Sequence, residues 1–464
     1  MSRLVPMVGL AALLLTSACA VGPVYHAPLE APVSLAAPPV PALTAAPPAQ
    51  AWWVAFQDLE LDSLAARAVA ANLDVAQAVA RLDQARALFK NRQLDLAPRV
   101  TSEATYSRSD EQVPGFSTGR VDIAQTDLGF DAAWEIDLFG HVRHQIEASA
   151  AEADAARADL ADVQVSVAAE VARNYLELRG AQARRAVAEE NAAAQRETLK
   201  LTDIRLDVGY GDPVDVQSAR ARLKATEALI PPLIAQQTQA GYRLAVLLGL
   251  RPGALDQELV ALPPQPARAV ALPIGDVSAL LRHRPDVRVA ERRLAAETAR
   301  TGVATADLFP RVKVTGFIGL LSGDVGSLFH GDSAAWAVSP SVTWPAFDFG
   351  GARARLRAQK AKGAESLAAY HQTVLRAIED LNDAVVAYGQ RQAQVARLAE
   401  QVDAARKAAD LARIRYREGS VDFLRVLDAD GSRLEAEDAL TQAQTASNTD
   451  VVAIYKALGG GWSS

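Results

Sequence analysis

The chain has 464 residues, 6% aromatic residues, one cysteine and a formal net charge of −7. The acidic balance argues against nucleic acid as a partner, because surfaces that bind nucleic acid need a basic stripe. A single cysteine excludes an intramolecular disulfide and a zinc site made of thiols, and the length is sufficient for two or three domains.

The N-terminus has the pattern of a secretory signal. A basic residue and an apolar run over residues 5–15 precede Cys19, and this run is too short for a permanent membrane helix. The pattern resembles a bacterial lipoprotein signal, in which residues 1–18 are removed and Cys19 is lipidated. Thr16 stands where such signals usually have leucine, so an ordinary cleavable signal is the alternative. Ala20, rather than aspartate, favours sorting to the outer membrane.

Residues 19–57 are predicted to form a lipid-anchored tether. They are rich in proline and alanine up to about residue 51 and show no helical period. Ordered structure is expected to begin near Trp52. One helix is predicted over residues 58–95, and a counterpart over residues 276–307.

Each of these helices is followed by a change to an alternating pattern. Residues 99–107 and 121–134 are predicted strands on either side of a polar loop, and residues 312–320 and 336–347 flank a second loop. Strands near ten residues long cross a bilayer obliquely. Neither two nor four strands pair both sheet edges, so a closed barrel requires several chains. A soluble β-hairpin is the alternative.

Two very long helices follow the strands. Gly140 and Gly209 lie 69 residues apart, as do Gly350 and Gly419, and neither interval contains proline. Each helix would be roughly 100 Å long at 1.5 Å per residue. In the second, hydrophobic residues recur at every seventh position, which predicts a coiled-coil seam. The seam positions are Leu367, Val374, Leu381, Tyr388, Val395, Val402, Ala409 and Tyr416.

Helices returning in the opposite direction are predicted over residues 214–248 and 423–458. Gly249 and Gly459 follow them, where glycine is typical of a helix C-terminal cap.

The chain therefore contains the same pattern twice. Pro98 recurs as Pro310 at an offset of 212 residues, and Gly209 recurs as Gly419 at an offset of 210. Constant spacing of several landmarks indicates a duplicated architecture. The repeats are predicted to span residues 58–262, with strands at about 98–136, and residues 263–464, with strands at about 310–349.

These features resemble the TolC-like outer-membrane efflux factors, most closely the lipoprotein branch called NodT or OprM-like. The resemblance covers essentially the whole mature chain. It is carried by Cys19-Ala20-Val21-Gly22-Pro23, Trp53 with Phe56 and Leu61, the two Pro-Arg-Val strand starts, Trp134-Glu135-Ile136-Asp137-Leu138-Phe139-Gly140, Arg415-Tyr416-Arg417-Glu418-Gly419 and Leu458-Gly459-Gly460-Gly461-Trp462.

The resemblance implies a mainly α fold with membrane β: duplicated coiled-coil helical hairpins plus two β-hairpins. It implies a homotrimer with a 12-stranded β-barrel in outer-membrane lipid and a 12-helix α-barrel in the periplasm. The family docks onto a periplasmic adaptor and an inner-membrane transporter, commonly of the resistance-nodulation-division type. Together they expel drugs, metals or other small solutes, so neither catalysis nor a cofactor is expected.

The turns that join long and returning helices are predicted to form the periplasmic tips, where the adaptor docks. Glycine is expected there at positive φ, and aspartate as the N-cap of the returning helix. Ordinary turn chemistry is the alternative interpretation of the same residues. The tip residues are Gly209, Gly211, Asp212, Gly419 and Asp422.

Leu424 and Asp428 are spaced i,i+4 and share a helix face just beyond the second turn. In the resembled family the matching positions line the closed aperture, so three copies would form an apolar constriction and an acidic ring that favours cations. A core leucine and a solvated aspartate are the alternative. Arg205 and Arg415 are expected to pair with acidic residues of neighbouring helices.

His141 and His144 are spaced i,i+3, but without a third ligand nearby no metal site is expected. No arrangement typical of a catalytic site is present either. Two other functions remain open: an exit duct for type I protein secretion, and a periplasmic coiled-coil scaffold or adaptor lipoprotein.

Overall fold

The computed structural model describes residues 20–28, 43–44, 46, 51–112, 115, 118–260, 272–273, 276 and 282–460, apart from the side chains at 43, 273 and 349. Cys19 and the predicted signal lie outside these residues. The chain forms two compact units. Unit 1 comprises the described parts of 1–30, 80–157 and 289–372, and unit 2 those of 31–79, 158–288 and 373–464. Among the described helices, none combines the length and apolarity needed to cross a bilayer.

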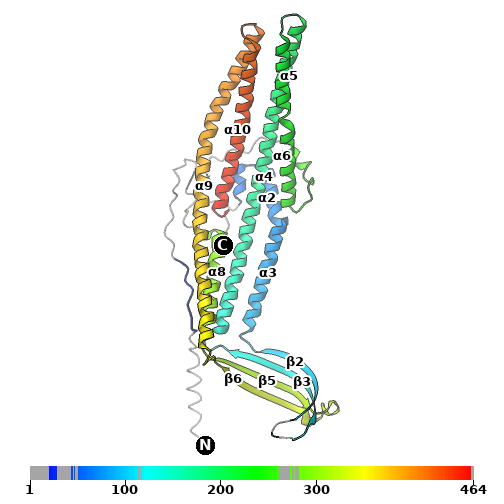
Figure 1. The fold of residues 1–464 in the computed structure, drawn as a ribbon, viewed down its shortest axis with the longest axis vertical. Helices are drawn as coiled ribbons and strands as arrows, with labels where there is room; N and C mark the ends of the chain where they lie inside the picture. The colour runs from blue at the N-terminus through cyan, green and yellow to red at the C-terminus, as the bar shows by residue number, and fades with distance from the viewer. Residues whose placement is uncertain are drawn as a thin grey trace. The chain divides into compact units, whose positions relative to one another are not determined.

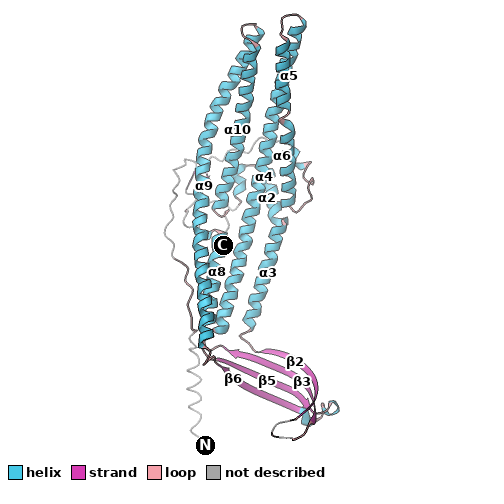
Figure 2. Ribbon diagram, in the orientation of Figure 1, coloured by secondary structure: helices cyan, strands magenta, loops and turns pink. Residues whose placement is uncertain are grey.

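The element order repeats a helical segment, a strand pair, a long helix and a returning segment (Figures 1 and 2). The helices are α2 Leu59–Ala71, α3 Leu73–Leu94, α4 His141–Asp207, α5 Pro213–Glu227, α6 Ile230–Leu247, α8 Pro285–Ala306, α9 Phe349–Arg417 and α10 Phe423–Ala457. The strands are β1 Leu43–Thr44, β2 Arg99–Glu111, β3 Val121–Ile136, β4 Leu272–Pro273, β5 Arg311–Ser322 and β6 Ala334–Thr343. Short 3-10 turns are η1 Trp52–Phe56, η2 Glu258–Val260, η3 Val325–Ser327 and η4 Gly331–Ser333.

In unit 1, the two strand pairs join into one antiparallel sheet in the order β2-β3-β5-β6 (Figure 2). The first hairpin is longer than predicted, because β2 continues to Glu111. The last strand is shorter, ending at Thr343 instead of residue 347. Pro345 follows two residues later and has no N–H to donate to a strand ladder.

The pleat of this sheet separates apolar from polar side chains. Pairing keeps even-numbered residues beside even-numbered ones, as in the row Phe130, Ile318 and Trp336. All three of these side chains are exposed. The same apolar face carries Val100, Ala104, Leu128, Val314, Leu320 and Val338, and the opposite face carries Glu103, Asp127, Asp131, Lys313, Thr315 and Ser339. An exposed face with this alternation suits contact with lipid on one side and water on the other.

The two hairpins are held at their bases by the same contact. The indole Nε1 of Trp134 donates to the carbonyl of Leu96 at 3.0 Å, and that of Trp344 donates to the carbonyl of Leu308 at 3.1 Å. The duplication therefore extends to side-chain contacts.

The described part of the predicted tether is attached to unit 1. The Val21 amide donates to the Phe139 carbonyl at 3.0 Å, and the Tyr25 hydroxyl donates to Glu291 at 2.7 Å. Gly22, at φ +133°, packs so closely on Gly302 that a side chain there would collide with it. Residues 20–25 thus connect the first turns of α4 to α8.

The predicted single helix over 58–95 is wrong, because it is broken at Asn72. The Asn72 backbone is extended, and its side chain accepts from the amides of Asp74 and Val75, so it caps a new helix, α3. Its amide nitrogen also donates to the Leu247 carbonyl at 2.8 Å. The counterpart α8 begins at Pro285, and residues 277–281 of that prediction lie outside the described part.

The first returning segment is also two helices instead of one. α5 ends at Glu227 and α6 begins at Ile230, because Pro231 and Pro232 lack the N–H groups that a continuous helix needs. The second returning helix, α10, is continuous. Gly249 and Gly459 have φ of +71° and +84°, which confirms the predicted caps.

The main core of unit 2 forms where α2, α4, α6, α9 and α10 meet. Trp52 stacks on Tyr455 at 5.1 Å between ring centroids, and the Tyr175 hydroxyl donates to Asp58 at 2.7 Å. The predicted seam of α9 is confirmed from Leu381 onward, and only Leu367 is exposed. The buried seam residues are Leu381, Tyr388, Val395, Val402, Ala409 and Tyr416.

Asp162 is a charged group in an unfavourable position in unit 2. Burial raises its pKa to about 6 from an ordinary value of 3.8, and the Asp286 carboxylate also raises it, against a lowering effect of Arg284. Arg284 is already engaged, donating to Asp286 at 2.8 Å and to the Ala457 carbonyl at 3.0 Å. The ionised form of Asp162 is therefore destabilising in the folded state.

Replacing Asp162 with asparagine is expected to stabilise the protein at pH 7. Because the folded-state pKa is raised, folding gains stability as pH falls through about 6. The ionised carboxylate costs at most about 3 kcal/mol above that pH. Thermal unfolding of Asp162→Asn at pH 7 and pH 4 tests this, with the exposed Asp403→Asn as control. An advantage of the same size at both pH values would contradict the assignment.

Candidate functional site: the hairpin tips

The two tips have the same backbone geometry. Gly209 and Gly419 have φ of +81° and +73°, and the amides that follow them donate to the carbonyls of Arg205 and Arg415, both at 2.9 Å. Gly211 does not have positive φ. It is needed because a Cβ there would lie 2.5 Å from the backbone nitrogen of Leu206.

Aspartate caps the returning helix at both tips. Asp212 accepts from the Val214 amide at 2.8 Å, and Asp422 accepts from the Arg425 amide at 3.1 Å. Burial raises the pKa of Asp215, and Asp212 and Asp422 raise it further. The carboxylates of the two tips are therefore close enough to repel one another.

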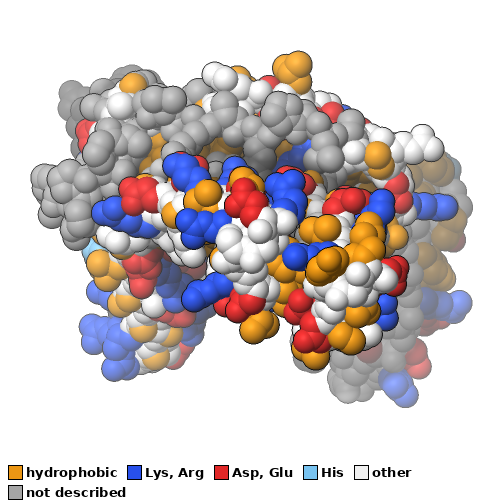
Figure 3. All heavy atoms as spheres, turned by 90° about the horizontal axis from the view of Figure 1, so that it is seen from above, with side chains coloured by type: hydrophobic (Ala, Val, Ile, Leu, Met, Phe, Trp, Pro, Cys, Tyr) orange, Lys and Arg blue, Asp and Glu red, His pale blue; other side chains and the backbone are white. Residues whose placement is uncertain are grey.

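Leu424 and Asp428 lie on the open face of α10. Leu424 is 62% exposed and Asp428 is exposed, whereas Phe423 and Val426 are buried against Tyr416. Phe423 and Val426 thus pack the start of α10 against α9, and the side chains of Leu424 and Asp428 remain available to contact a partner or to line a lumen. Figure 3, seen from the hairpin ends, shows acidic, basic and hydrophobic side chains interspersed.

Arg205 binds the neighbouring hairpin through a carbonyl and a ring. Its guanidinium donates to the Tyr416 carbonyl at 3.0 Å and lies 4.5 Å from the centre of the Tyr416 ring. Arg415, its counterpart, is exposed. Pairing of the two arginines with acidic residues stays a prediction.

The sequence analysis did not identify the polar residues that connect the two hairpins further along the helices from the tips. Glu437 on α10 accepts from Arg406 of α9 at 2.7 Å and from Asn191 of α4 at 2.9 Å. Buried Asp430 pairs with Arg413 at 2.8 Å, and burial raises its pKa. The sequence signal that could have identified them is the set of acidic residues, including Asp430 and Glu437, that interrupts the apolar pattern of α10.

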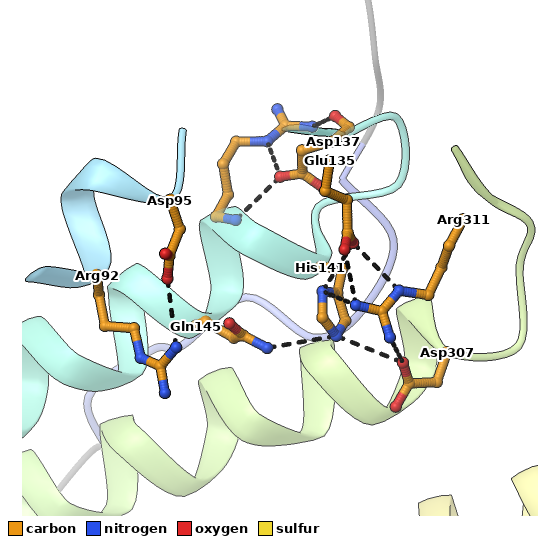
Figure 4. A network of polar contacts seen from close by, with 9 residues as sticks. Arg92, Asp95, Glu135, Asp137, His141, Gln145, Asp307 and Arg311 are labelled. Carbon is orange, nitrogen blue, oxygen red and sulfur yellow. Dashed lines mark hydrogen bonds and ion pairs between the residues drawn. The ribbon is translucent and has the colours of Figure 1, made fainter. Parts of the chain in front are cut away.

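The two histidines make separate polar contacts in unit 1. His141 Nδ1 lies 3.1 Å from Glu135, which also accepts two hydrogen bonds from Arg311 (Figure 4). Burial lowers the pKa of His141, and Arg311 lowers it further. His144 contacts Glu147 and the Val21 carbonyl. Within the described residues, no group of three ligating side chains suits a metal ion.

A family model described as "outer membrane efflux protein" matches residues 64–250 and 277–460. The chain is 31% identical to Nodulation protein T of Rhizobium leguminosarum bv. trifolii, covering 93% of this chain and 92% of that protein. It is 31% identical to outer membrane protein OprJ of Pseudomonas aeruginosa, covering 98% and 96%.

A solved structure of the outer-membrane channel OprN superposes with a TM-score of 0.92 at 46% identity, covering 96% of this chain and 100% of that one. The open state of the Neisseria gonorrhoeae MtrE outer membrane channel gives a TM-score of 0.84 at 28% identity, covering 96% and 98%. Sequence and fold thus agree over nearly the whole length. The chain belongs to the outer membrane efflux protein family, in its TolC-like NodT/OprM-like branch, and is an exit duct of the outer membrane that extends into the periplasm.

Proposed function

We propose that three copies of the chain form one continuous duct, with twelve strands closed into a β-barrel and twelve helices into an α-barrel. The order β2-β3-β5-β6 supports this, because β2 and β6 are sheet edges. Unpaired backbone groups are costly in lipid, and pairing β6 of one copy with β2 of the next removes them. At least about eight strands are needed for a closed barrel, so one sheet of four is too few. Two sheets would reach that minimum, but the interior of an eight-stranded barrel is filled by side chains, so a third copy is needed for an open passage.

We further propose the chain organisation predicted from the sequence. Residues 1–18 are a removed signal, residues 19–57 a tether lipidated at Cys19, and residues 58–262 and 263–464 the two repeats. The contact of Ala20 with Gly140 supports the anchor, because it positions the start of the tether at the junction of β3 and α4. This junction lies next to the base of the apolar sheet face.

The tips are the proposed gate and docking surface. Three Leu424 side chains form the apolar constriction and three Asp428 carboxylates the acidic ring, and the exposure of both supports this role. The turns around Gly209 and Gly419 are the proposed contact for a periplasmic adaptor, which connects the duct to an inner-membrane transporter of the resistance-nodulation-division type.

Small solutes, drugs or metals are the proposed cargo. Relatives of similar length are named antibiotic efflux pump outer membrane protein ArpC and toluene efflux pump outer membrane protein TtgC, both of Pseudomonas putida. The pump and adaptor select the cargo, while the duct provides the passage.

Single-channel recording tests the proposal. The purified protein in a planar bilayer is expected to give discrete, low-conductance channels, together with a trimeric mass in detergent. Folded, membrane-inserted protein that gives no channels would contradict the duct and favour the coiled-coil scaffold. Channels that pass an unfolded polypeptide would favour the secretion duct.

A further inference from the structure

A cavity of about 520 Å³ lies in unit 1, where the ends of two helices meet the base of the sheet. Its walls come from the last turn of α3, the first turns of α4, and the ends of β2, β3 and β5 nearest to these helices. Cavities that bind small molecules usually have volumes of about 300–1,000 Å³. This one is therefore large enough for a small organic solute.

The charged strand residues of the cavity lie on the polar face of the sheet. Arg99, Glu135, Arg311 and Lys313 all have odd numbers, and pairing keeps odd-numbered residues beside odd-numbered ones. In the barrel proposed above, this face surrounds the aqueous interior. The cavity then opens on the path of the solutes.

The acidic side chains around the cavity are already engaged (Figure 4). Asp95 accepts from Arg92 at 3.2 Å, and Glu135 accepts from Arg311 at 2.8 Å. The ring of His141 lies 3.1 Å from the same Glu135 carboxylate. The negative charges of the cavity wall are therefore balanced by their own neighbours.

Two cations of the wall have no such partners. Arg99 and Lys313 are exposed, and among the residues that the structure describes, neither side chain forms an ion pair or a hydrogen bond. Lys313 lies opposite Glu135 in the strand ladder, but Arg311 and His141 already engage that carboxylate. The charges of Arg99 and Lys313 are thus available to a bound anion.

The two cations lie on either side of a small residue. Arg99 pairs with Ala133, which pairs in turn with Thr315, two residues after Lys313 on β5. The outer strands of this trio are about 10 Å apart, and only a methyl group projects between them in this row. The long side chains of Arg99 and Lys313 can therefore reach one ligand from opposite sides.

We propose that this cavity binds a small organic anion with at least two anionic groups, such as a di- or tricarboxylate, during its passage. Arg99 holds one group through two parallel hydrogen bonds, and Lys313 holds another across Ala133. Asn91 and the first turn of α4 line the same cavity, and a helix N-terminus favours negative charge. The site rests on the proposed duct and names a class of solute for it.

Citrate is the probe for this site. It is expected to interrupt the single-channel current in a concentration-dependent way, and to bind the detergent-solubilised protein in isothermal titration. Arg99→Gln combined with Lys313→Gln is expected to weaken citrate binding about tenfold or more, because both available cations are removed. Arg357→Gln combined with Lys360→Gln is the matched control, since it removes the same charge from exposed residues of α9 outside the cavity.

A change of shape without a change of charge separates a defined site from general attraction. Ala133 is exposed in the cavity wall, so Ala133→Leu fills the space between Arg99 and Lys313 and keeps both charges. This variant is expected to weaken citrate binding while the channels still conduct.

Three outcomes would overturn the site: no citrate binding by the wild type, undiminished binding in both cavity variants, or an equal loss in the control pair. Inorganic phosphate that binds as tightly as citrate would overturn the requirement for two anionic groups. Folded, inserted protein that gives no channels would instead overturn the duct, and titration in detergent would still decide whether the cavity binds citrate.

Discussion

Asp428→Ala is expected to give a duct that conducts more and discriminates less between cations and anions. In the proposed gate, the substitution removes three carboxylates, which widens the aperture at the level of Asp428 and abolishes the acidic ring. Three charges at roughly 8 Å from an ion on the axis contribute about 1.5 kcal/mol in water, so the cation preference should fall about tenfold. Single-channel conductance and the reversal potential in a salt gradient measure the two effects.

The duplication provides a matched control for this variant. Ser218 occupies the position equivalent to Asp428 in the first hairpin, and Val214 occupies that of Leu424. Ser218→Ala is expected to leave the cation preference unchanged, because it removes no charge. An Asp428→Ala channel with wild-type conductance and selectivity would exclude the ring at this level. Equal changes in both variants would indicate a general loosening of the tips.

Trp52→Ala is expected to destabilise unit 2 by about 3–5 kcal/mol, the usual cost of removing a large buried aromatic side chain. Trp52 is 1% exposed and stacks on Tyr455 at 5.1 Å, with Phe56 at 6.5 Å. The cavity would open between the start of the helical unit and the end of α10, so the loss affects both repeats.

Thermal unfolding followed by helical circular dichroism measures this loss in detergent. Val54→Ala, in the same short turn but 51% exposed, is expected to shift the unfolding temperature little. Similar shifts for the two variants would mean that Trp52 contributes little to the core. A loss of channel activity without a shift would point to a role outside folding.

Much of the fold was predictable because its landmarks act locally. Glycine at positive φ ends α4 and α9 at Gly209 and Gly419, and a seven-residue repeat requires no tertiary information. The strand pairs were found from alternation alone. The order of the strands and the parity of their pairing needed the structure, because single strands do not specify their neighbours.

The helix breaks at Asn72 and before Pro231 were not predicted, because tertiary contacts as well as local sequence determine where these helices end. Asn72 caps α3 because its side chain also reaches Leu247, a partner 175 residues away in sequence. Pro231 and Pro232 were visible, but a proline pair is compatible with either a kink or a new helix. The tip residue Arg205 was predicted to pair with a carboxylate. Its hydrogen bond to the Tyr416 carbonyl depends on how two hairpins that are far apart in the sequence pack together.

The open edges of the sheet have a consequence for biogenesis. A lone chain in lipid would expose the backbone groups of β2 and β6, at several kcal/mol for each unpaired group. Insertion and association are then one event, and its rate should rise steeply with the local density of chains at the membrane. The lipid proposed at Cys19, by confining chains to a surface before the strands insert, would act as a concentrating device for this step.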